Sequence, residues 1–461
     1  MRRLPIPLLL LGALALAPAA AEAKLFDVNN DLRQDLVVGL PGWQISDGAE
    51  VGAIYVRGAK RGLLGRVSVL TRKELGVPEG GSNAMIGASV TSADFDGDDF
   101  EDLAFGARGA VVIAYGASSF PSVPRTTILR AVDGEDPSLI AGDMNGENVD
   151  DLALGPGDLD LYFGKNGDGI TQPPDATLAP PEGAGANFGF VLAHGDVTGD
   201  GHAELFEAAP GIPDFADDPP QPGHVSVALG RERGPRPLEW VAQRMRGGPV
   251  SLAIGDVDGD RYGDLVAGIP VDDFVGEDDR GTAGAVKVWF GGPESLSKQP
   301  MTITQGSPGI PGTNEQFDRF GASVAVGKLD NDRYADIVVG APVENKSRGR
   351  VTIIRGGPAG YARTGNRSFG FETRGVPGDF KRGDRNFGLQ VGLLDFSGDD
   401  RLDLALLDRG FDRSIQQRSR RGGVTVLRGT RRGISFKRAA RLTFFGEGVV
   451  PGERGEAPVL G

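Results

Sequence analysis

The sequence has 461 residues, including 73 glycines, 31 prolines and no cysteine, and it carries a formal net charge of −14. The lack of cysteine excludes disulfides, thiolate metal sites and a lipid-anchored cysteine, and the negative charge argues against binding nucleic acid through a basic face. The Gly- and Pro-rich composition favours many short strands over long helices, and no apolar run after the N-terminus is long enough to span a membrane.

The first 23 residues are predicted to be a secretory signal peptide. Arg2 and Arg3 form a basic n-region, an apolar stretch follows, and Ala21-Glu22-Ala23 matches an A-x-A cleavage site. Cleavage after Ala21 fits the pattern nearly as well. We therefore expect a secreted protein, in an extracellular or periplasmic space, that is stabilised by its core and by bound metal instead of disulfides.

One acidic motif recurs along the rest of the chain. Each copy resembles "DFDGDDFEDLAFG", in which nine residues rich in carboxylates lead directly into an apolar run. Seven copies, spaced 49 to 72 residues apart, indicate a repeat architecture. The copies begin at Asp27, Asp94, Asp143, Asp196, Asp256, Lys328 and Asp395.

The residues around each copy predict four short β-strands. In the sixth unit these are "RFGASVAVG" before the acidic motif and "YADIVVGAP", "GRVTIIRGG" and "RSFGFETRG" after it. Seven such units predict an all-β, seven-bladed β-propeller with four antiparallel strands per blade and the acidic loop between the first and second strands. The blades are expected at about 24–84, 85–135, 136–186, 187–248, 249–318, 319–385 and 386–461.

Two short motifs link these units to a known family. A Phe-Gly pair opens several of them, as at Phe320-Gly321, and the sixth apolar run ends in Gly340-Ala341-Pro342. With the acidic loop, this pattern resembles the FG-GAP repeat of the integrin α-subunit N-terminal β-propeller and its bacterial relatives. The resemblance covers nearly the whole mature chain, but the third unit has no Phe-Gly and the first lacks most of its leading strand.

This resemblance implies that the acidic loops share one face and that partners bind the opposite face. It leaves open how the ring closes, either by packing of the first blade against the last or by a short C-terminal addition.

The acidic loops are predicted to bind Ca²⁺. Carboxylates at loop positions 1, 3 and 5 point inward together, and the carboxylate at position 9 returns from the next strand. They would repel one another without a hard cation, and a backbone carbonyl at position 7 completes the oxygen ligands. An EF-hand is excluded, because position 12 is Val38, Phe105 or Ala267 in three copies and the flanking segments are strands.

About six loops are expected to hold one ion each. Positions 1, 3, 5 and 9 of the seven loops hold 23 of the 63 carboxylate residues, and six Ca²⁺ ions would bring the chain, with its net charge of −14, close to neutrality. The predicted ligands, in order of positions 1, 3, 5, 7 and 9, are Asp27, Asn29, Asp31, Arg33 and Asp35; Asp94, Asp96, Asp98, Phe100 and Asp102; Asp143, Asn145, Glu147, Val149 and Asp151; Asp196, Thr198, Asp200, His202 and Glu204; Asp256, Asp258, Asp260, Tyr262 and Asp264; and Asp395, Ser397, Asp399, Arg401 and Asp403.

The sixth loop is predicted not to bind metal. Lys328 occupies position 1 and leaves Asp330, Asp332 and Asp336. An ammonium at that position would repel a divalent ion and could itself neutralise the cluster. For the degenerate loops, a solvated acidic turn stays an alternative, because Asp and Gly favour turns in any case.

Three functions are considered for the chain. The first is a protein-binding or cell-adhesion module, because the loops expected on the far face carry Trp43, Phe215 and Phe274 beside charged residues. The second is a lectin-type propeller that binds a glycan, and the third is a hydrolase or lyase with carboxylates in the central channel. No catalytic constellation is visible, since the only histidines are His194, His202 and His224. We therefore expect a binding protein with no enzyme activity.

Overall fold

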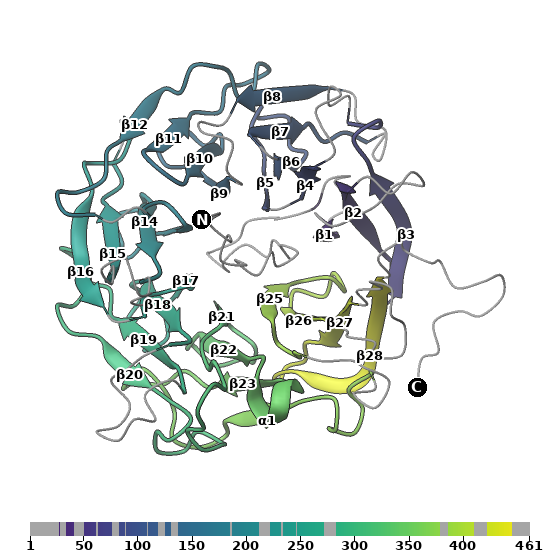
Figure 1. Cartoon of the computed structure of the whole chain (residues 1–461), viewed down its shortest axis with the longest axis vertical. Coiled ribbons are helices and arrows are strands. Elements are labelled where there is room, and N and C mark those ends of the chain that lie inside the picture. The colour runs from purple at the N-terminus through teal and green to yellow at the C-terminus, as the bar shows by residue number, and fades with distance from the viewer. Residues whose placement is uncertain are drawn as a thin grey trace, which may run out of the picture.

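The computed structural model of the chain is an all-β propeller. Seven small sheets stand around a central axis, with the first strand of most sheets near the axis and the last strand at the rim (Figure 1). This architecture confirms the predicted fold class. The structure describes residues 27, 34–40, 50–60, 63–75, 83–87, 89–107, 109–118, 125–130, 137–184, 187–211, 222–231, 234–245, 247–271, 283–378, 386–409 and 422–444.

The second to seventh sheets each contain four antiparallel strands in sequence order. The second to fourth sheets comprise β5 (Val90–Ala93), β6 (Asp102–Ala107), β7 (Ala110–Ala114) and β8 (Thr126–Arg130); β9 (Ser138–Gly142), β10 (Asp151–Gly155), β11 (Leu159–Tyr162) and β12 (Ala176–Leu178); and β13 (Val191–Gly195), β14 (Glu204–Ala209), β15 (Gly223–Ala228) and β16 (Glu239–Met245). The fifth to seventh comprise β17 (Ser251–Gly255), β18 (Asp264–Ile269), β19 (Ala285–Trp289) and β20 (Met301–Ile303); β21 (Ser323–Gly327), β22 (Asp336–Ala341), β23 (Arg350–Ile354) and β24 (Arg367–Phe369); and β25 (Gln390–Leu394), β26 (Asp403–Arg409), β27 (Gly422–Arg428) and β28 (Ser435–Phe444).

The first sheet departs from the predicted pattern. Its antiparallel strands are β1 (Leu36–Leu40), β2 (Glu50–Lys60) and β3 (Leu63–Leu70), and β1 follows the first acidic segment and so takes the place of a second strand. The fourth member, β4 (Asn83–Ile86), pairs with β2 in parallel, with Ile86 opposite Gly52. The expectation of four antiparallel strands in every blade is therefore wrong for this sheet, because β4 is a link from the next unit.

The same parallel link recurs between other neighbouring sheets. Phe320 forms a parallel bridge to Gly284, and Phe387 forms one to Gly349. In each case the aromatic residue of a Phe-Gly pair reaches the glycine before the third strand of the preceding sheet, and both phenylalanines are fully buried. The Phe-Gly motif thus attaches each of these sheets to the one before it.

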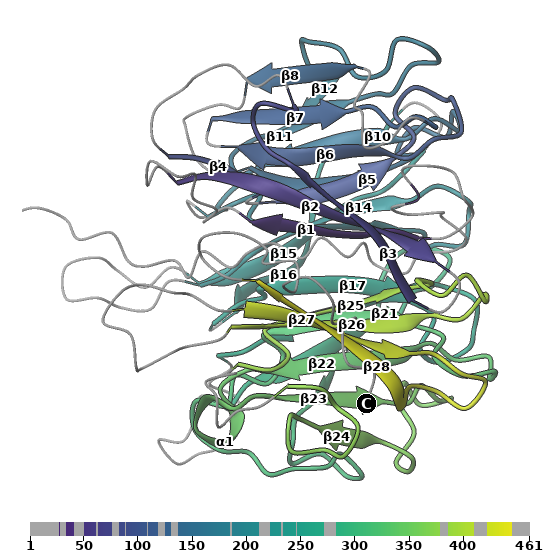
Figure 2. The same ribbon diagram turned by 90° about the vertical axis from the view of Figure 1, so that its right-hand side faces the viewer.

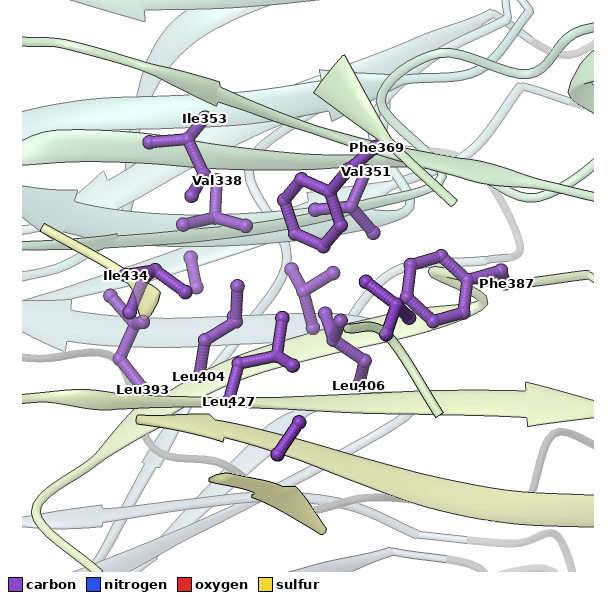
Figure 3. Packing of buried hydrophobic residues seen from close by; sticks show 14 of the residues in the cluster. Val338, Val351, Ile353, Phe369, Phe387, Leu393, Leu404, Leu406, Leu427 and Ile434 are labelled. Carbon is purple, nitrogen blue, oxygen red and sulfur yellow. The ribbon is translucent and has the colours of Figure 1, made fainter. Parts of the chain in front are cut away.

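The hydrophobic core lies between the sheets. Each buried cluster contains side chains from two neighbouring sheets, because the faces of a blade are covered by the blades on both sides. Figure 3 shows one such cluster, in which Val338 and Val351 of the sixth sheet pack against Leu404 and Leu427 of the seventh. The second strand of a sheet is covered on both faces, so β18 and β22 are buried at every residue.

The ring closes by the packing of the first sheet against the last. Leu36 and Val38 of β1 share one buried cluster with Ala405 and Val424 of the seventh sheet. The side chain of Gln34 also accepts a hydrogen bond from the backbone N–H of Asp395. Within the described ranges no strand is shared between these two sheets. Of the two alternatives for closure, the described residues therefore show side-by-side packing.

The described residues contain a single short helical turn, α1 (Glu344–Ser347), which lies at the left edge of the side view (Figure 2). No described helix has the length and apolar character needed to cross a membrane. The predicted signal peptide, residues 1–23, lies outside the described residues, as do Trp43, Phe215 and Phe274.

Candidate metal sites

The seven acidic loops, 27–35, 94–102, 143–151, 196–204, 256–264, 328–336 and 395–403, are called here the first to seventh acidic loops. In the second to seventh sheets, each loop joins the first strand to the second. Because consecutive strands run antiparallel, these turns all emerge at one end of the propeller. The turns between third and fourth strands share this end, and all other connections lie at the opposite end.

Position 9 of the second to seventh loops is a carboxylate held by the backbone of its own sheet. Asp264 accepts N–H bonds from Val257, at position 2, over 2.8 Å and from Gly291, after the third strand, over 2.9 Å. Asp102 is held in the same way by Phe95 and Gly116. The position-9 carboxylate therefore joins the acidic loop to the third strand.

Sequence reasoning missed the glycine in this arrangement. A Cβ on Gly291 would overlap the carbonyl oxygen of Gly263, and the equivalent glycines are equally crowded by a backbone carbonyl. A glycine after each third strand, visible in every unit, was the available signal. The equivalent glycines are Gly116, Gly164, Gly230, Gly356 and Gly429.

Position 1 orders the backbone of the loop. Asp256 accepts N–H bonds from Gly259 over 2.6 Å, from Asp260 over 3.0 Å and from Arg261 over 3.0 Å. Asp94 and Asp143 accept the same three bonds from their own loops. These bonds curl the loop so that its side chains converge, as the spacing of carboxylates predicts.

Neighbouring acidic loops are also bonded to one another. The backbone N–H of Gly263 donates to the carbonyl of Asp196 over 3.1 Å, and that of Ala335 donates to Asp256 over 2.7 Å. Asp150 and Asp94 form the same contact between the third and second loops. Order in one loop is therefore transmitted to the next through main-chain bonds.

Three loops bring three carboxylates together, with one oxygen from each lying within 4.8 Å of the others. Burial raises the pKa of Asp102 to about 8 and that of Glu204 and Asp264 to about 7. Such clusters are compatible with divalent cation binding, because a cation offsets the cost of ionised, crowded carboxylates. The groups are Asp94, Asp96 and Asp102; Asp196, Asp200 and Glu204; and Asp256, Asp258 and Asp260.

The second loop also contains an unsatisfied oxygen. Asp96 is only 8% exposed, and one of its carboxylate oxygens is buried with no hydrogen-bond partner among the described residues. Its other oxygen forms an ion pair with Arg125. A buried carboxylate oxygen without a donor is costly, and an oxygen-preferring ion would satisfy it. The donor set of this loop therefore fits Ca²⁺.

Other predicted ligands are placed differently. In the third loop Asn145 is buried and accepts the N–H of Glu147, but Asp143, Glu147 and Asp151 do not converge as a described trio. In the first loop Asp27 and Asp35 are buried, whereas Asn29, Asp31 and Arg33 lie outside the described residues.

The position-7 residues are held in their loops by hydrogen bonds from their backbone N–H groups. Phe100, His202 and Tyr262 each donate a backbone N–H to the position-5 carboxylate of their own loop. The predicted role of the position-7 carbonyls, including those of Val149 and Arg401, stays a prediction.

The sixth repeat unit of the chain matches a known protein family. A family model described as the FG-GAP repeat matches residues 320–354, which run from Phe320 through the sixth acidic loop to the end of β23. The chain therefore contains an FG-GAP repeat at these residues. Among curated proteins, this FG-GAP chain is 29% identical over 217 residues to integrin alpha-PS2 of Drosophila melanogaster and 28% identical over 217 residues to integrin alpha-V of Gallus gallus.

These matches cover 44% of the FG-GAP chain but only 15% and 20% of the two relatives. Integrin alpha-5 of Xenopus laevis is 32% identical over 161 residues, which cover 33% of the chain and 14% of that relative. Among solved structures, the subtype N11 neuraminidase-like protein of A/flat-faced bat/Peru superposes with a TM-score of 0.34 at 10% identity, over 78% of this chain and 87% of that one.

The sixth acidic loop of the FG-GAP chain has a built-in cation, but it is not Lys328. Lys328 is exposed, whereas one guanidinium nitrogen of Arg355 contacts Asp330 and lies 3.0 Å from a carboxylate oxygen of Asp332. Arg355 directly follows the third strand and precedes Gly356, which is the glycine found after the third strand in each unit. The suggestion that Lys328 neutralises the cluster is therefore corrected in favour of Arg355.

The seventh loop shows a related arrangement. Arg428, which is equivalent to Arg355, lies 3.1 Å from a carboxylate oxygen of Asp399, and Arg401 lies 2.9 Å from the same oxygen. The other oxygen of Asp399 and the hydroxyl of Ser397 are buried without a partner among the described residues. The signal that sequence reasoning missed is an arginine directly before the glycine that follows the third strand. At this position the other units carry Tyr115, Phe163, Leu229 or Phe290.

Replacing Arg355 is expected to make the sixth loop respond to calcium. In Arg355→Gln, Asp330 and Asp332 lose their counter-charge, so the calcium-free protein should lose about 1 kcal/mol of unfolding free energy. Added Ca²⁺ should restore that loss. Urea unfolding with and without Ca²⁺ measures both effects, with Arg374→Gln, which alters an exposed arginine, as the control. Equal curves for the two variants would contradict the role of Arg355.

Proposed function

We propose that this protein is a secreted, calcium-stabilised FG-GAP propeller that binds a protein partner at the face opposite the acidic loops. Calcium binding is supported by the three converging carboxylate groups and by the buried, unpartnered oxygen of Asp96. About six loops would each hold one ion, and the Arg355-paired sixth loop would hold none. Bound Ca²⁺ would provide the charge that lets the buried position-9 carboxylates ionise.

The observation that carries the binding role is the distribution of exposed apolar side chains. Among the described residues, the only large hydrophobic side chains left exposed are Val250 (38%), Val271 (37%) and Phe317 (59%). Val250 precedes β17, Val271 follows β18, and Phe317 precedes β21, so all three lie at the end of the propeller away from the acidic loops. Exposed apolar residues grouped on one face favour a protein-binding surface.

A binding role is proposed in preference to an enzyme because the three histidines have structural surroundings. His194 packs against Gly142 of the neighbouring sheet, and burial lowers its pKa to about 4. His202 lies in the fourth acidic loop beside Asp200, and His224 is bonded to Glu207 inside the fourth sheet. None of these contacts places a histidine beside a nucleophile in an open site.

The binding face is tested with two triple variants. Val250→Ser, Val271→Ser and Phe317→Ser are combined in one protein, and Glu294→Ser, Lys298→Ser and Arg431→Ser, in turns at the acidic-loop end, are combined in a control. Each immobilised protein is exposed, in millimolar Ca²⁺, to secreted proteins of the source culture. We expect the wild type and the control to retain a partner that the first variant loses, with equal unfolding midpoints for all three. Equal retention by both variants would place the partner elsewhere, and no retained protein would contradict a binding role.

A further inference from the structure

A second group of buried oxygen atoms lies at the face opposite the acidic loops. Gln305 follows β20 of the fifth sheet, Asp318 lies in the connection that leads to β21, and Glu344 is the first residue of α1, between β22 and β23. The β20–β21 and β22–β23 connections both emerge at the end away from the acidic loops. Gln305, Asp318 and Glu344 are 3%, 4% and 7% exposed, so three polar side chains from two connections are buried together.

Glu344 lies at the centre of this group. One of its carboxylate oxygens accepts a bond from Nε2 of Gln305 over 2.7 Å, and the other accepts a bond from Nδ2 of Asn345 over 3.2 Å. The two segments are in contact, because the N–H of Val343, directly before Glu344, donates to the carbonyl oxygen of Asp318 over 3.3 Å. Burial and the carboxyl group of Glu344 raise the pKa of Asp318, so the two groups share a proton unless a cation lies between them.

No basic side chain among the described residues is seen to pair with these two carboxyl groups. In the part of the chain that the structure describes, neither Asp318 nor Glu344 forms an ion pair, and the nearby Arg319 and Lys346 are exposed. Burial and the neighbouring carboxyl groups of Glu344 and Glu315 raise the pKa of Asp318. Within the described ranges the group therefore has excess negative charge without an observed counter-ion.

A separate atom indicates that a ligand is missing. Oε1 of Gln305 is buried and has no hydrogen-bond partner among the described residues. It belongs to the same amide group as the Nε2 that bonds Glu344, so a rotation of this amide would turn Oε1 toward the carboxyl group. A buried amide oxygen next to two carboxyl groups is a third oxygen donor, and leaving it unsatisfied costs free energy.

We propose that Asp318, Glu344 and Gln305 form a site for a divalent cation of the Ca²⁺ class, separate from the acidic loops. On binding, the ion replaces the proton shared by the two carboxyl groups, which is released to solvent, and takes Oε1 of Gln305 as a further ligand. The low exposure of all three residues favours a bare ion over a lysine or arginine side chain of a partner, because such a side chain would need an opening to reach them.

The site has a consequence for the face on which it lies. Phe317, the most exposed of the three apolar residues on that face, directly precedes Asp318 and has a φ of 71°. Asn345, Lys346 and Ser347 after Glu344 also have positive φ values, of 55°, 63° and 65°. Such conformations persist only where the surroundings hold them. A bound ion would hold both segments, and so, if the proposed function is correct, calcium would order part of the partner-binding surface.

The site is tested by counting bound calcium in Glu344→Gln. A glutamine amide can donate to Asp318 in place of the shared proton, so the fold should persist and the calcium-free midpoint should be equal to or above that of the wild type. After dialysis against millimolar Ca²⁺, elemental analysis should find one ion fewer per chain than in the wild type. Asp158→Asn, which alters an exposed carboxylate, is the control and should keep the full count.

A second variant keeps the test decisive if Glu344→Gln does not fold. Gln305→Leu removes only the amide ligands and should also bind one ion fewer at sub-millimolar calcium. An unchanged count in either folded variant overturns the site and leaves the carboxyl pair as a shared-proton contact. The same count of bound ions tests the acidic loops separately. If the wild type binds a single ion and Glu344→Gln binds none, the result supports this site and contradicts calcium binding by the loops.

Discussion

In calcium-free buffer, the unfolding midpoint of the protein is expected to fall as the pH rises from about 4 to 8. Burial raises the pKa of the position-9 carboxyl group of Asp102 to about 8, and that of the others described to about 7. In the unfolded chain these groups titrate near 4. The folded state therefore binds more protons throughout this window, and its stability decreases until the pH passes the folded-state pKa values. The other groups are Asp151, Glu204, Asp264, Asp336 and Asp403.

Calcium should reverse the sign of this dependence. A bound cation stabilises the ionised carboxylates, which brings their folded-state pKa values below those of the unfolded chain, so stability should then rise or stay level above pH 4. We expect the calcium-free midpoint to drop on the order of 5–10 °C across the window. Thermal melts at several pH values, in chelated buffer and at saturating Ca²⁺, measure the two slopes, with Na⁺ at equal ionic strength as the control. Parallel slopes in the two buffers would contradict calcium binding by the loops.

The second large effect is expected from Gly340→Ala. Gly340 lies near the end of β22 in the sixth sheet, and a Cβ at this position would overlap the carbonyl oxygen of Gly388 in the Phe-Gly pair of the seventh sheet. The obstacle is main chain, so no rotamer change relieves it, and the two sheets must move apart. We expect a loss of about 3 kcal/mol or more of unfolding free energy, measured by urea denaturation.

Gly292→Ala is the matched control for this prediction. The nearest atom to a Cβ on Gly292 is the Ser295 carbonyl oxygen, 3.7 Å away, which is ordinary van der Waals distance. Its unfolding free energy should stay within about 0.5 kcal/mol of the wild type. If both variants lose the same amount of stability, the contact between the sheets does not explain the glycine of the Gly-Ala-Pro motif.

This contact gives a physical reason for the two halves of the repeat. The equivalent glycines Gly39, Gly155 and Gly268 would meet the carbonyl oxygens of Gly87, Gly189 and Gly321 in the same way. The glycine of the Phe-Gly pair, which is Ile86-Gly87 in the second unit, and the glycine that ends the apolar run therefore meet across each of these sheet interfaces. The motif is a packing signature between successive blades, and the acidic loop is a separate feature at the other end of the strands.

The arginines change how the acidic loops are compared. From their ligand positions alone, the second and seventh loops would be expected to bind calcium as well as the fourth and fifth loops. However, Arg125 contacts Asp96 in the second loop, and Arg428 contacts Asp399 in the seventh loop. A guanidinium and a divalent ion compete for the same oxygens, so these two loops should need more free calcium to load than the fourth and fifth loops. The charge of a loop therefore depends on a residue more than 20 positions away in the sequence.

The features that depend on local pattern could be predicted from the amino-acid sequence. The alternating strands, the seven acidic loops and the convergence of carboxylates in loops such as 256–264 follow from residue spacing within about ten positions, because strand pleat and turn geometry act over that range. The predicted fold class was confirmed for this reason.

The contacts between segments that are distant in the sequence became visible in the three-dimensional structure alone. It showed that β4 is a parallel link to β2, that β1 packs against the seventh sheet, and that Arg355, not Lys328, neutralises the sixth loop. It also brought Gln305, Asp318 and Glu344 together from two connections. These contacts depend on the packing of whole sheets against one another, and no local periodicity encodes which side chains then meet.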